Sequence, residues 1–250
     1  MSRIAWLRLA LIAGSVLALE AACRGGLIAA FTMIPPSEMA AALIELLSSG
    51  KGWVDVGRTL RIIATCLTVA VVAGLLLGIV LHLLPRLRRA AEPLLTSYYA
   101  VPVFVLYPTF IMLFGANDVP LIIIGALFAV IVMAVNTLTG LRRVPPVLLK
   151  VARMQGLSTV ATVWQVMLPA TAPFLVTGVK LALAYAFIGV IAGEFILSTA
   201  GIGHAIAYAY NDFDNRTMYA LLLFIIALAT VLNLSLHAWE QRLLRRLGKA

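Results

Sequence analysis

The ionisable side chains of this sequence do not form a catalytic or metal-binding cluster. His82, His204 and His237 lie far from one another in sequence and have no carboxylates at the spacing of metal ligands, which indicates surface or interface residues. Cys23 and Cys66 stand in apolar surroundings without a CxxC pair, which predicts inert thiols. The sequence also lacks Gly-x4-Gly-Lys-Ser/Thr, the loop that holds ATP phosphates. We expect no enzyme activity, no cofactor and no metal in this chain.

Two charged residues stand inside long apolar stretches, where a charge at the membrane centre costs about 2.5–3.5 kcal/mol. Lys180 and Glu194 are fourteen residues apart, which is about 21 Å along a helix and roughly 40° short of the same face. Two interpretations stay open. The pair lines a solute path, where Lys180 favours an anionic solute, or each residue forms an ion pair between helices. Asn136 and Tyr107 are weaker candidates for the same path.

The composition indicates that most of this chain is embedded in a lipid bilayer. Apolar residues make up 63% of the chain, charged residues only 12%, and the mean hydropathy is +1.05. A soluble domain of 250 residues is about half apolar and about a quarter charged. The net charge of +9 falls in short clusters between apolar stretches, a pattern of membrane topology rather than of nucleic-acid binding. We therefore expect a single all-α domain in the bilayer.

Six stretches have the roughly 20 residues that a helix needs to cross a bilayer. They are Ile4–Ala22, Ile62–Leu84, Leu94–Phe114, Val119–Leu141, Ala172–Leu197 and Met218–Ala238. The first resembles a signal peptide, but Glu20 stands in a poor cleavage context, so we expect this helix to stay in place. The pairs Gly74/Gly78 and Gly189/Gly193 permit close helix approach.

The expected segments follow from these spans. Residues 1–32 form the first membrane helix and the start of a periplasmic segment, and residues 33–57 form an interfacial segment. Residues 58–240 form a membrane core, and residues 241–250 form a basic cytoplasmic tail. Apolar residues at helical spacing after Pro35-Pro36 predict a short amphipathic helix in the interfacial segment, with Ser37 as its N-cap.

Lys and Arg residues are unequally divided between alternate loops. One set of loops and termini carries thirteen: Arg3, Arg8, Arg86, Arg88, Arg89, Arg142, Arg143, Lys150, Arg153, Arg242, Arg245, Arg246 and Lys249. The other carries five: Arg24, Lys51, Arg58, Arg61 and Arg216. Since basic loops stay in the cytoplasm, both termini are predicted to be cytoplasmic, and six spans satisfy this.

The connection 142–171 is long for a helical bundle, which favours a functional role. Pro145-Pro146 suits a helix start, and the sequence predicts a helix over Val147–Gln155. Gly156 stands where a left-handed C-terminal cap belongs, and Ser158 is placed to cap a second helix that runs to Leu168.

The same connection carries a recognisable signature. Lys150-Val151-Ala152-Arg153-Met154-Gln155-Gly156 is followed, after nine residues, by Val166-Met167-Leu168-Pro169. This resembles the cytoplasmic signature of ABC importer permeases, Glu-Ala-Ala, three residues, Gly, nine residues, Ile-x-Leu-Pro. The chain departs from it at Lys150, where the family has Glu. Either the ATPase subunit that the resemblance implies as a partner carries acidic residues that compensate for the reversed charge, or the side chain at position 150 faces solvent.

The resemblance covers roughly residues 33–246. It includes Ile34-Pro35-Pro36-Ser37, Val101-Pro102, Tyr107-Pro108, Gly140-Leu141-Arg142, Thr177-Gly178-Val179-Lys180 and Gly201-Ile202-Gly203. Among its branches, the sequence is most similar to the nitrate, taurine and aliphatic-sulfonate permeases. The resemblance implies a type I importer permease fold, with about six membrane helices and a cytoplasmic coupling helix.

The resemblance also implies binding partners and a cellular location. They are ABC ATPase subunits that bind ATP and Mg²⁺, a second permease copy, a periplasmic or lipid-anchored solute-binding protein, membrane lipids, and the bacterial inner membrane. The residues that it assigns to coupling are Lys150, Val151, Ala152, Arg153, Gly156, Leu168 and Pro169. The alternative is an autonomous secondary transporter or channel, but such folds show broken helices and inverted repeats that are not evident here.

Overall fold

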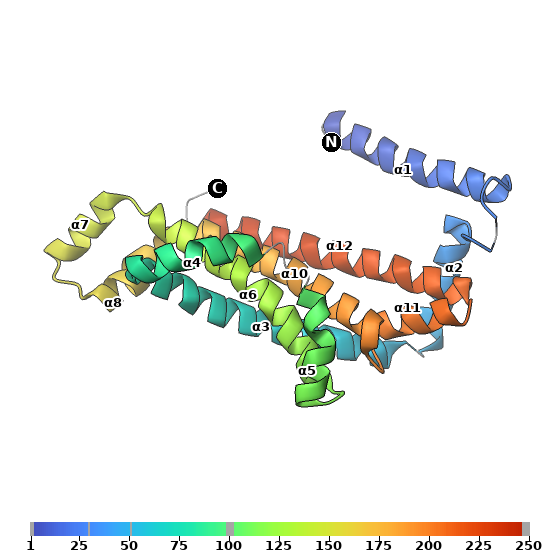
Figure 1. Cartoon of the computed structure of the whole chain (residues 1–250). Coiled ribbons are helices and arrows are strands. Elements are labelled where there is room, and N and C mark those ends of the chain that lie inside the picture. The colour runs from blue at the N-terminus through green and yellow to red at the C-terminus, as the bar shows by residue number, and fades with distance from the viewer. Residues whose placement is uncertain (1–2, 30, 51, 99–102, 247–250) are drawn as a thin grey trace. The chain divides into compact units, whose positions relative to one another are not determined.

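A computed structural model describes residues 3–29, 31–50, 52–98 and 103–246 of the chain (Figure 1), and every regular element within them is helical. The chain divides into two compact units. Unit 1 consists of Met1–Arg58 and Glu194–Leu228, and unit 2 of Thr59–Gly193 and Ala229–Ala250. The all-α membrane fold expected from the sequence is confirmed. The expected segment boundaries at 33, 58 and 241 stay predictions.

Four of the described helices are long and apolar enough to cross a membrane. They are α3 (Trp53–Leu83), α6 (Asp118–Arg142), α10 (Ala172–Leu197) and α12 (Asn215–Arg246). Each contains or closely matches one of the predicted spans. The first predicted span lies within α1 (Arg3–Arg24), a helix of 22 residues.

The span predicted over Leu94–Phe114 is not a single helix in the described residues. Helix α4 (Pro85–Ser97) ends inside it, and a 3-10 turn (Val103–Leu106) leads into α5 (Tyr107–Phe114). The signature residues Val101-Pro102 lie outside the described part of the chain. Three arginines and Glu92 make α4 polar and amphipathic, so it does not begin a membrane span.

Helix α6 is the central element of unit 2. Glycines on α3 bring the two backbones together: a Cβ at Gly74 would stand 2.6 Å from Met133 Cβ, and one at Gly78 would stand 2.6 Å from Thr137 Cβ. On α10, a Cβ at Gly189 would stand 2.9 Å from Gly125 Cα. The predicted close approach at these glycines is confirmed. A buried cluster fills the same contacts, with Ile62, Cys66, Leu121, Ile124, Ala129, Met133, Ala186 and Val190 among its members.

In unit 1, the start of α2 (Pro36–Ser49) is joined to the end of α1 by a polar cluster. The hydroxyl of Ser37 donates to Glu20 Oε1 at 2.7 Å, and its N–H donates to Glu20 Oε2 at 3.0 Å. Arg24 Nε completes the cluster at 2.5 Å from Glu20 Oε1. The predicted Ser37 N-cap is therefore wrong. Pro35 occupies the cap position, and the Ser37 side chain is used in this contact between helices.

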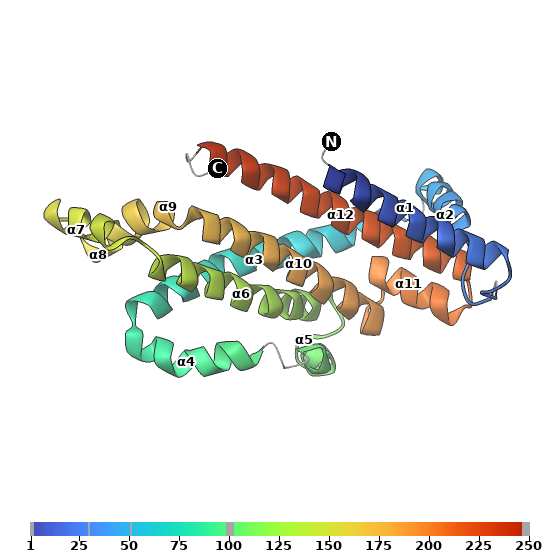
Figure 2. The ribbon, with the colours of Figure 1, turned by 90° about the horizontal axis from the view of Figure 1, so that it is seen from above.

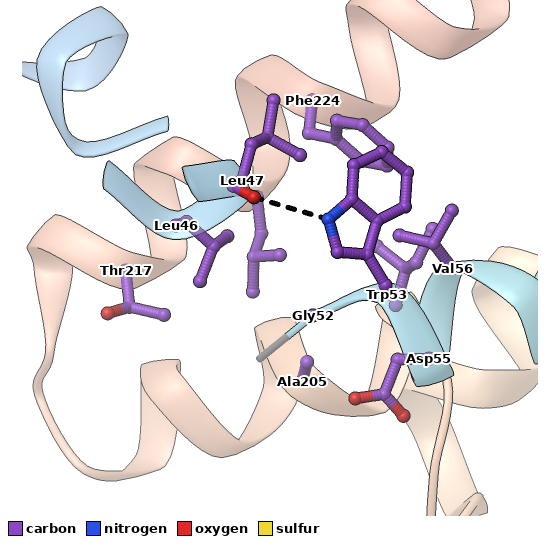
Figure 3. Close-up of a pocket in the computed structure, with 11 residues that line it drawn as sticks. Leu46, Leu47, Gly52, Trp53, Asp55, Val56, Ala205, Thr217 and Phe224 are labelled. Carbon is purple, nitrogen blue, oxygen red and sulfur yellow. Dashed lines mark hydrogen bonds between the residues drawn. The ribbon is translucent and has the colours of Figure 1, made fainter. Parts of the chain in front are cut away.

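The other end of α2 is joined to the start of α3, also within unit 1. Trp53 Nε1 donates to Leu47 O at 3.2 Å, and the indole lies beside Phe224 over a cavity of about 140 Å³ (Figure 3). Nearby, α11 (Ile202–Asn211) leads to Asp214, which caps α12 by accepting from Thr217 N at 3.0 Å. Hydrogen bonds from the Thr217 side chain and N–H lower the pKa of the Asp214 carboxyl below its usual value.

The close contact between α3 and α6 gives a direct stability prediction. Gly78→Leu forces a side chain into Thr137, and such overpacking costs about 1–3 kcal/mol. We expect the melting temperature of the purified chain to fall by several degrees. Gly57→Leu on the same helix is the control, because a Cβ there meets nothing within 4 Å. Equal effects of the two substitutions would show that α3 does not approach α6 closely at Gly78.

Candidate functional site

The connection between α6 and α10 forms a projecting helical element. Helix α7 (Pro146–Met154) is followed by α8 (Thr159–Thr162), a π-helical segment η3 (Val163–Met167) and α9 (Leu168–Ala170). All belong to unit 2, and in both ribbon views α7 and α8 lie beyond the ends of α6 and α10 (Figures 1 and 2). The helix predicted over Val147–Gln155 is confirmed.

A tight turn ends α7 at Gly156. The residue has a φ of 69°, and its N–H donates to Arg153 O at 3.0 Å. The N–H of Leu157 donates to Ala152 O at 3.1 Å. These two bonds are the Schellman pattern of a left-handed cap, which confirms the helix cap predicted at Gly156. A Cβ at this position would meet nothing within 4 Å. Glycine is therefore favoured by the left-handed backbone conformation and not by a lack of space.

The outer face of α7 is apolar and uncovered. Val147, Val151 and Met154 follow one another at spacings of four and three, which places them on one face of the helix. Their exposed fractions are 66%, 45% and 87%. Ala152 points inward at 1% exposure, while Lys150 and Arg153 are exposed. An uncovered apolar stripe rimmed by basic residues is a typical protein-binding surface.

The segment after Gly156 anchors this element to unit 2. Ser158 accepts from Ala161 N at 3.2 Å, which confirms its predicted cap. The helix widens to a π turn before Pro169, whose missing N–H and ring prevent a regular α-helical bond to the preceding turn. Val163, Met167 and Leu168 are buried with Leu141 and Val144, at the end of α6. Pro169 itself is exposed.

Lys150 lies in the second turn of α7, because the helix begins at Pro146. The helix dipole acts mainly on the first turn, so the Lys in place of Glu costs little within this chain. Its side chain is exposed. The Lys150 ammonium therefore acts mainly on a protein that binds to α7.

Lys180 is joined to α12 by an ion pair. Its Nζ lies 2.7 Å from Glu240 Oε2, and His237 Nδ1 lies 3.2 Å from the same oxygen. The side chains of Lys180 and Glu240 are 25% and 16% exposed. Of the two interpretations of Lys180, this geometry supports the ion pair between helices. Beside the pair, α10 and α12 enclose a mainly apolar cavity of about 380 Å³, lined in part by Phe187, Asn233 and Leu236.

Glu194 is enclosed within unit 1 and is fully buried. Its Oε2 accepts from Gly203 N at 3.0 Å, at the start of α11. A Cβ at Gly201, which has a φ of 105°, would stand only 2.3 Å from Glu194 Oε1. The carboxylate therefore caps α11 and requires a glycine beside it.

The two weaker path candidates make internal contacts in unit 2. Asn136 Nδ2 donates to Val132 O at 2.8 Å, one turn earlier in α6. Tyr107 is 2% exposed and belongs to the main buried cluster. In this conformation of the chain, neither the Tyr107 ring nor the Glu194 carboxylate is accessible to a solute.

Sequence reasoning did not identify Glu240 or the α7 stripe. Glu240 is sixty residues from Lys180, and no local spacing joins them. The stripe was visible as Val147, Val151 and Met154 at helical spacing. Trp164, on η3, is 55% exposed.

Residues 70–249 match the family model of the binding-protein-dependent transport system inner membrane component. The chain belongs to this family.

Three relatives are named as transport permeases. The permease is 26% identical over 216 residues to the taurine transport system permease protein of Escherichia coli K12, covering 84% of this chain and 78% of the relative. It is 25% identical over 244 residues to the putative aliphatic sulfonates transport permease protein of Bacillus subtilis 168, covering 97% and 88%. It is 27% identical over 184 residues to the nitrate import permease protein of Leptolyngbya laminosa, covering 74% and 66%.

The fold agrees with a solved transporter of the same architecture. An inward-facing structure of the MetNI methionine ABC transporter contains a chain that matches the permease with a TM-score of 0.66 at 19% identity. The match covers 77% of this chain and 94% of the other. The type I importer permease fold expected from the sequence is confirmed.

The Lys180–Glu240 contact gives a prediction that separates its two interpretations. Lys180→Met leaves the poorly solvated Glu240 carboxylate with His237 as its remaining polar neighbour, and the loss of the ammonium costs about 2 kcal/mol. We expect a lower melting temperature in detergent, recovered in the double variant Lys180→Met/Glu240→Leu. An unchanged melting temperature together with lost solute uptake would instead place Lys180 in the solute path.

Proposed function

We propose that this permease forms the translocation pathway of an ATP-driven importer and couples to a separate ATPase through residues 142–171. The observation that carries the proposal is the uncovered apolar face of α7. Val147, Val151 and Met154 are exposed at the tip of a projecting element, although apolar side chains outside the membrane gain stability when they are covered. A cleft on an ATPase subunit is the occupant that the family resemblance implies.

The connections of α7 explain how a push there would reach the membrane. The turn at Gly156 fixes the angle between α7 and α8 through the two cap bonds donated by the N–H groups of Gly156 and Leu157. The α8–η3–α9 segment runs with a single break at Thr171 into α10. Its buried face packs on Leu141 and Val144, so movement of α7 would be passed to α10 and resisted by α6. Closing of the ATPases would in this way reorient the pathway.

The energy source lies outside this chain. The sequence has no phosphate-binding loop, so ATP and Mg²⁺ would be bound by the partner and hydrolysed there. We propose the bacterial inner membrane as the location, with both termini in the cytoplasm. This orientation places the α7 element on the side where ATP is found. A second copy of the permease would complete the pathway, and a solute-binding protein would deliver the solute.

A small anion is the proposed solute class. The names of the three relatives give taurine, aliphatic sulfonates and nitrate as their solutes. Taurine and the sulfonates contain a sulfonate group, and nitrate is itself an oxyanion. Lys180 does not strengthen this proposal, because its ammonium is paired with Glu240. Uptake assays with purified importer and a panel of an alkyl sulfonate, nitrate and a neutral vitamin would test the class. Transport of only the neutral compound would exclude it.

Dependence on the ATPase separates this proposal from an autonomous transporter. We expect proteoliposomes that contain only this permease to hydrolyse no ATP and to accumulate no solute. Addition of the cognate ATPase and binding protein should restore both activities, and a variant ATPase that cannot hydrolyse ATP should not. Solute accumulation by the permease alone, driven by an ion gradient, would show instead that it is a secondary transporter.

The Gly156 turn gives a second functional prediction. Gly156→Val forces a β-branched residue into a left-handed conformation, at a cost of about 1–2 kcal/mol. We expect uptake to fall at least tenfold while membrane insertion is unchanged. Gly156→Asn is the matched control, since Asn tolerates this conformation and space is available. If the valine variant transports as well as the asparagine variant, coupling does not depend on this turn.

A further inference from the structure

Basic side chains from three elements of unit 2 lie within electrostatic reach of one another. His82 stands in the last turn of α3, Arg88 on α4, and Arg142 at the end of α6. Both guanidinium groups approach the same carboxylate oxygen, Glu92 Oε1: Arg88 Nε at 3.7 Å and Arg142 Nη1 at 3.4 Å. Arg86 and Arg89 on α4 and Arg143 after α6 add to the charge. One carboxylate oxygen is thus shared by two arginines.

Two nitrogens of this cluster are buried without a hydrogen-bond partner among the described residues. Nδ1 of His82 and Nε of Arg88 are shielded from solvent, and neither makes a hydrogen bond to any described residue. The 3.7 Å between Arg88 Nε and Glu92 is too long for such a bond. Buried polar atoms are nearly always hydrogen-bonded in folded proteins. These two nitrogens are therefore free to hydrogen-bond a group that lies outside the described residues.

A phosphate group has the chemistry that fits. Arginine binds phosphate through parallel N–H···O bonds, and a phosphate offers several oxygens to a convergent set of donors. Glu92 cannot fill this role, since its side chain is 48% exposed and one of its oxygens is already shared by two arginines.

The position of the cluster indicates a lipid as the source of the phosphate. It lies where α3 and α6, two helices able to span the membrane, come to their ends at Leu83 and Arg142. Spanning helices end at the depth of the lipid headgroups. Helix α4 is itself amphipathic: Leu87 and Leu94 share one face and are 45% and 73% exposed, and Arg89 lies on the opposite face. Such a helix lies in the membrane interface.

We propose that His82, Arg88 and Arg142 form a binding site for the phosphate of an anionic phospholipid, with α4 lying in the headgroup layer. The lipid would join the ends of α3, α4 and α6 next to the connection that leads to α7. Its acyl chains would follow the exposed leucines of α4, and its phosphate would supply the bonds that Arg88 Nε and His82 Nδ1 lack.

The test uses the full chain in detergent, titrated with a short-chain phosphatidylglycerol and followed by native mass spectrometry. Phosphatidylcholine and inorganic phosphate form the comparison arms. We expect phosphatidylglycerol to bind and phosphatidylcholine to bind much more weakly. Inorganic phosphate at millimolar concentration should not displace the lipid. No preference for the anionic lipid, or full displacement by inorganic phosphate, would overturn the proposal.

Matched variants separate a built site from general attraction. Arg88→Gln and Arg89→Gln remove the same charge from adjacent positions of α4, but only Arg88 has the buried Nε. We expect Arg88→Gln to weaken phosphatidylglycerol binding about fivefold or more, and Arg89→Gln less than twofold. Equal losses would indicate a diffuse electrostatic surface and contradict the site.

Glu92→Gln keeps the test decisive if the Arg88 variant fails to fold. It removes the carboxylate that competes for Arg88 and Arg142, and the Glu92 side chain is 48% exposed, so the substitution disturbs no buried packing. We expect this variant to bind phosphatidylglycerol more tightly than the wild-type chain. Unchanged or weaker binding would show that these two arginines do not hold the phosphate.

Discussion

The close packing of α6 against α3 and α10 is the constraint on which unit 2 depends. Gly74, Gly78 and Gly189 bring the backbones so near that even a methyl group would collide with the neighbouring helix. In lipid, helices gain little from hydrophobic burial, so association relies on such close contacts. The result is a firm block of three helices, and the connection between α6 and α10 is built on its end.

That connection is anchored on one side and uncovered on the other. The buried residues of η3 and α9 pack on the end of α6, while α7 presents Val147, Val151 and Met154 outward. The Gly156 turn lies between these two parts. A rigid base, a fixed angle and an exposed apolar tip together suit a lever moved by another subunit. A helix that only closed a loop would have no need for an uncovered stripe.

Much of this could be predicted from the sequence because the determinants are local. The spans follow from apolar length, and the ends of α7 and α8 follow from Gly156 and Ser158, whose cap bonds involve residues within five positions. The N-cap prediction at Ser37 was wrong because the Ser37 hydroxyl donates its hydrogen bond to Glu20, on another helix. The pairing of Lys180 with Glu240 also joins distant positions. The polar face of α4 was visible in Arg86, Arg88 and Arg89, but apolar Leu94 and the residues after it suggested a longer span.

Crosslinking from α7 tests directly whether this helix docks onto an ATPase subunit. A photoreactive amino acid at Met154, the most exposed member of the stripe, would be activated in intact cells, and the crosslinked product would be identified by mass spectrometry. We expect a single major adduct with a subunit that carries Gly-x4-Gly-Lys-Ser/Thr, and we expect this adduct to be lost when the label is moved to the buried Ala152. Adducts only with lipid, or only within the permease itself, would contradict a docking role for α7.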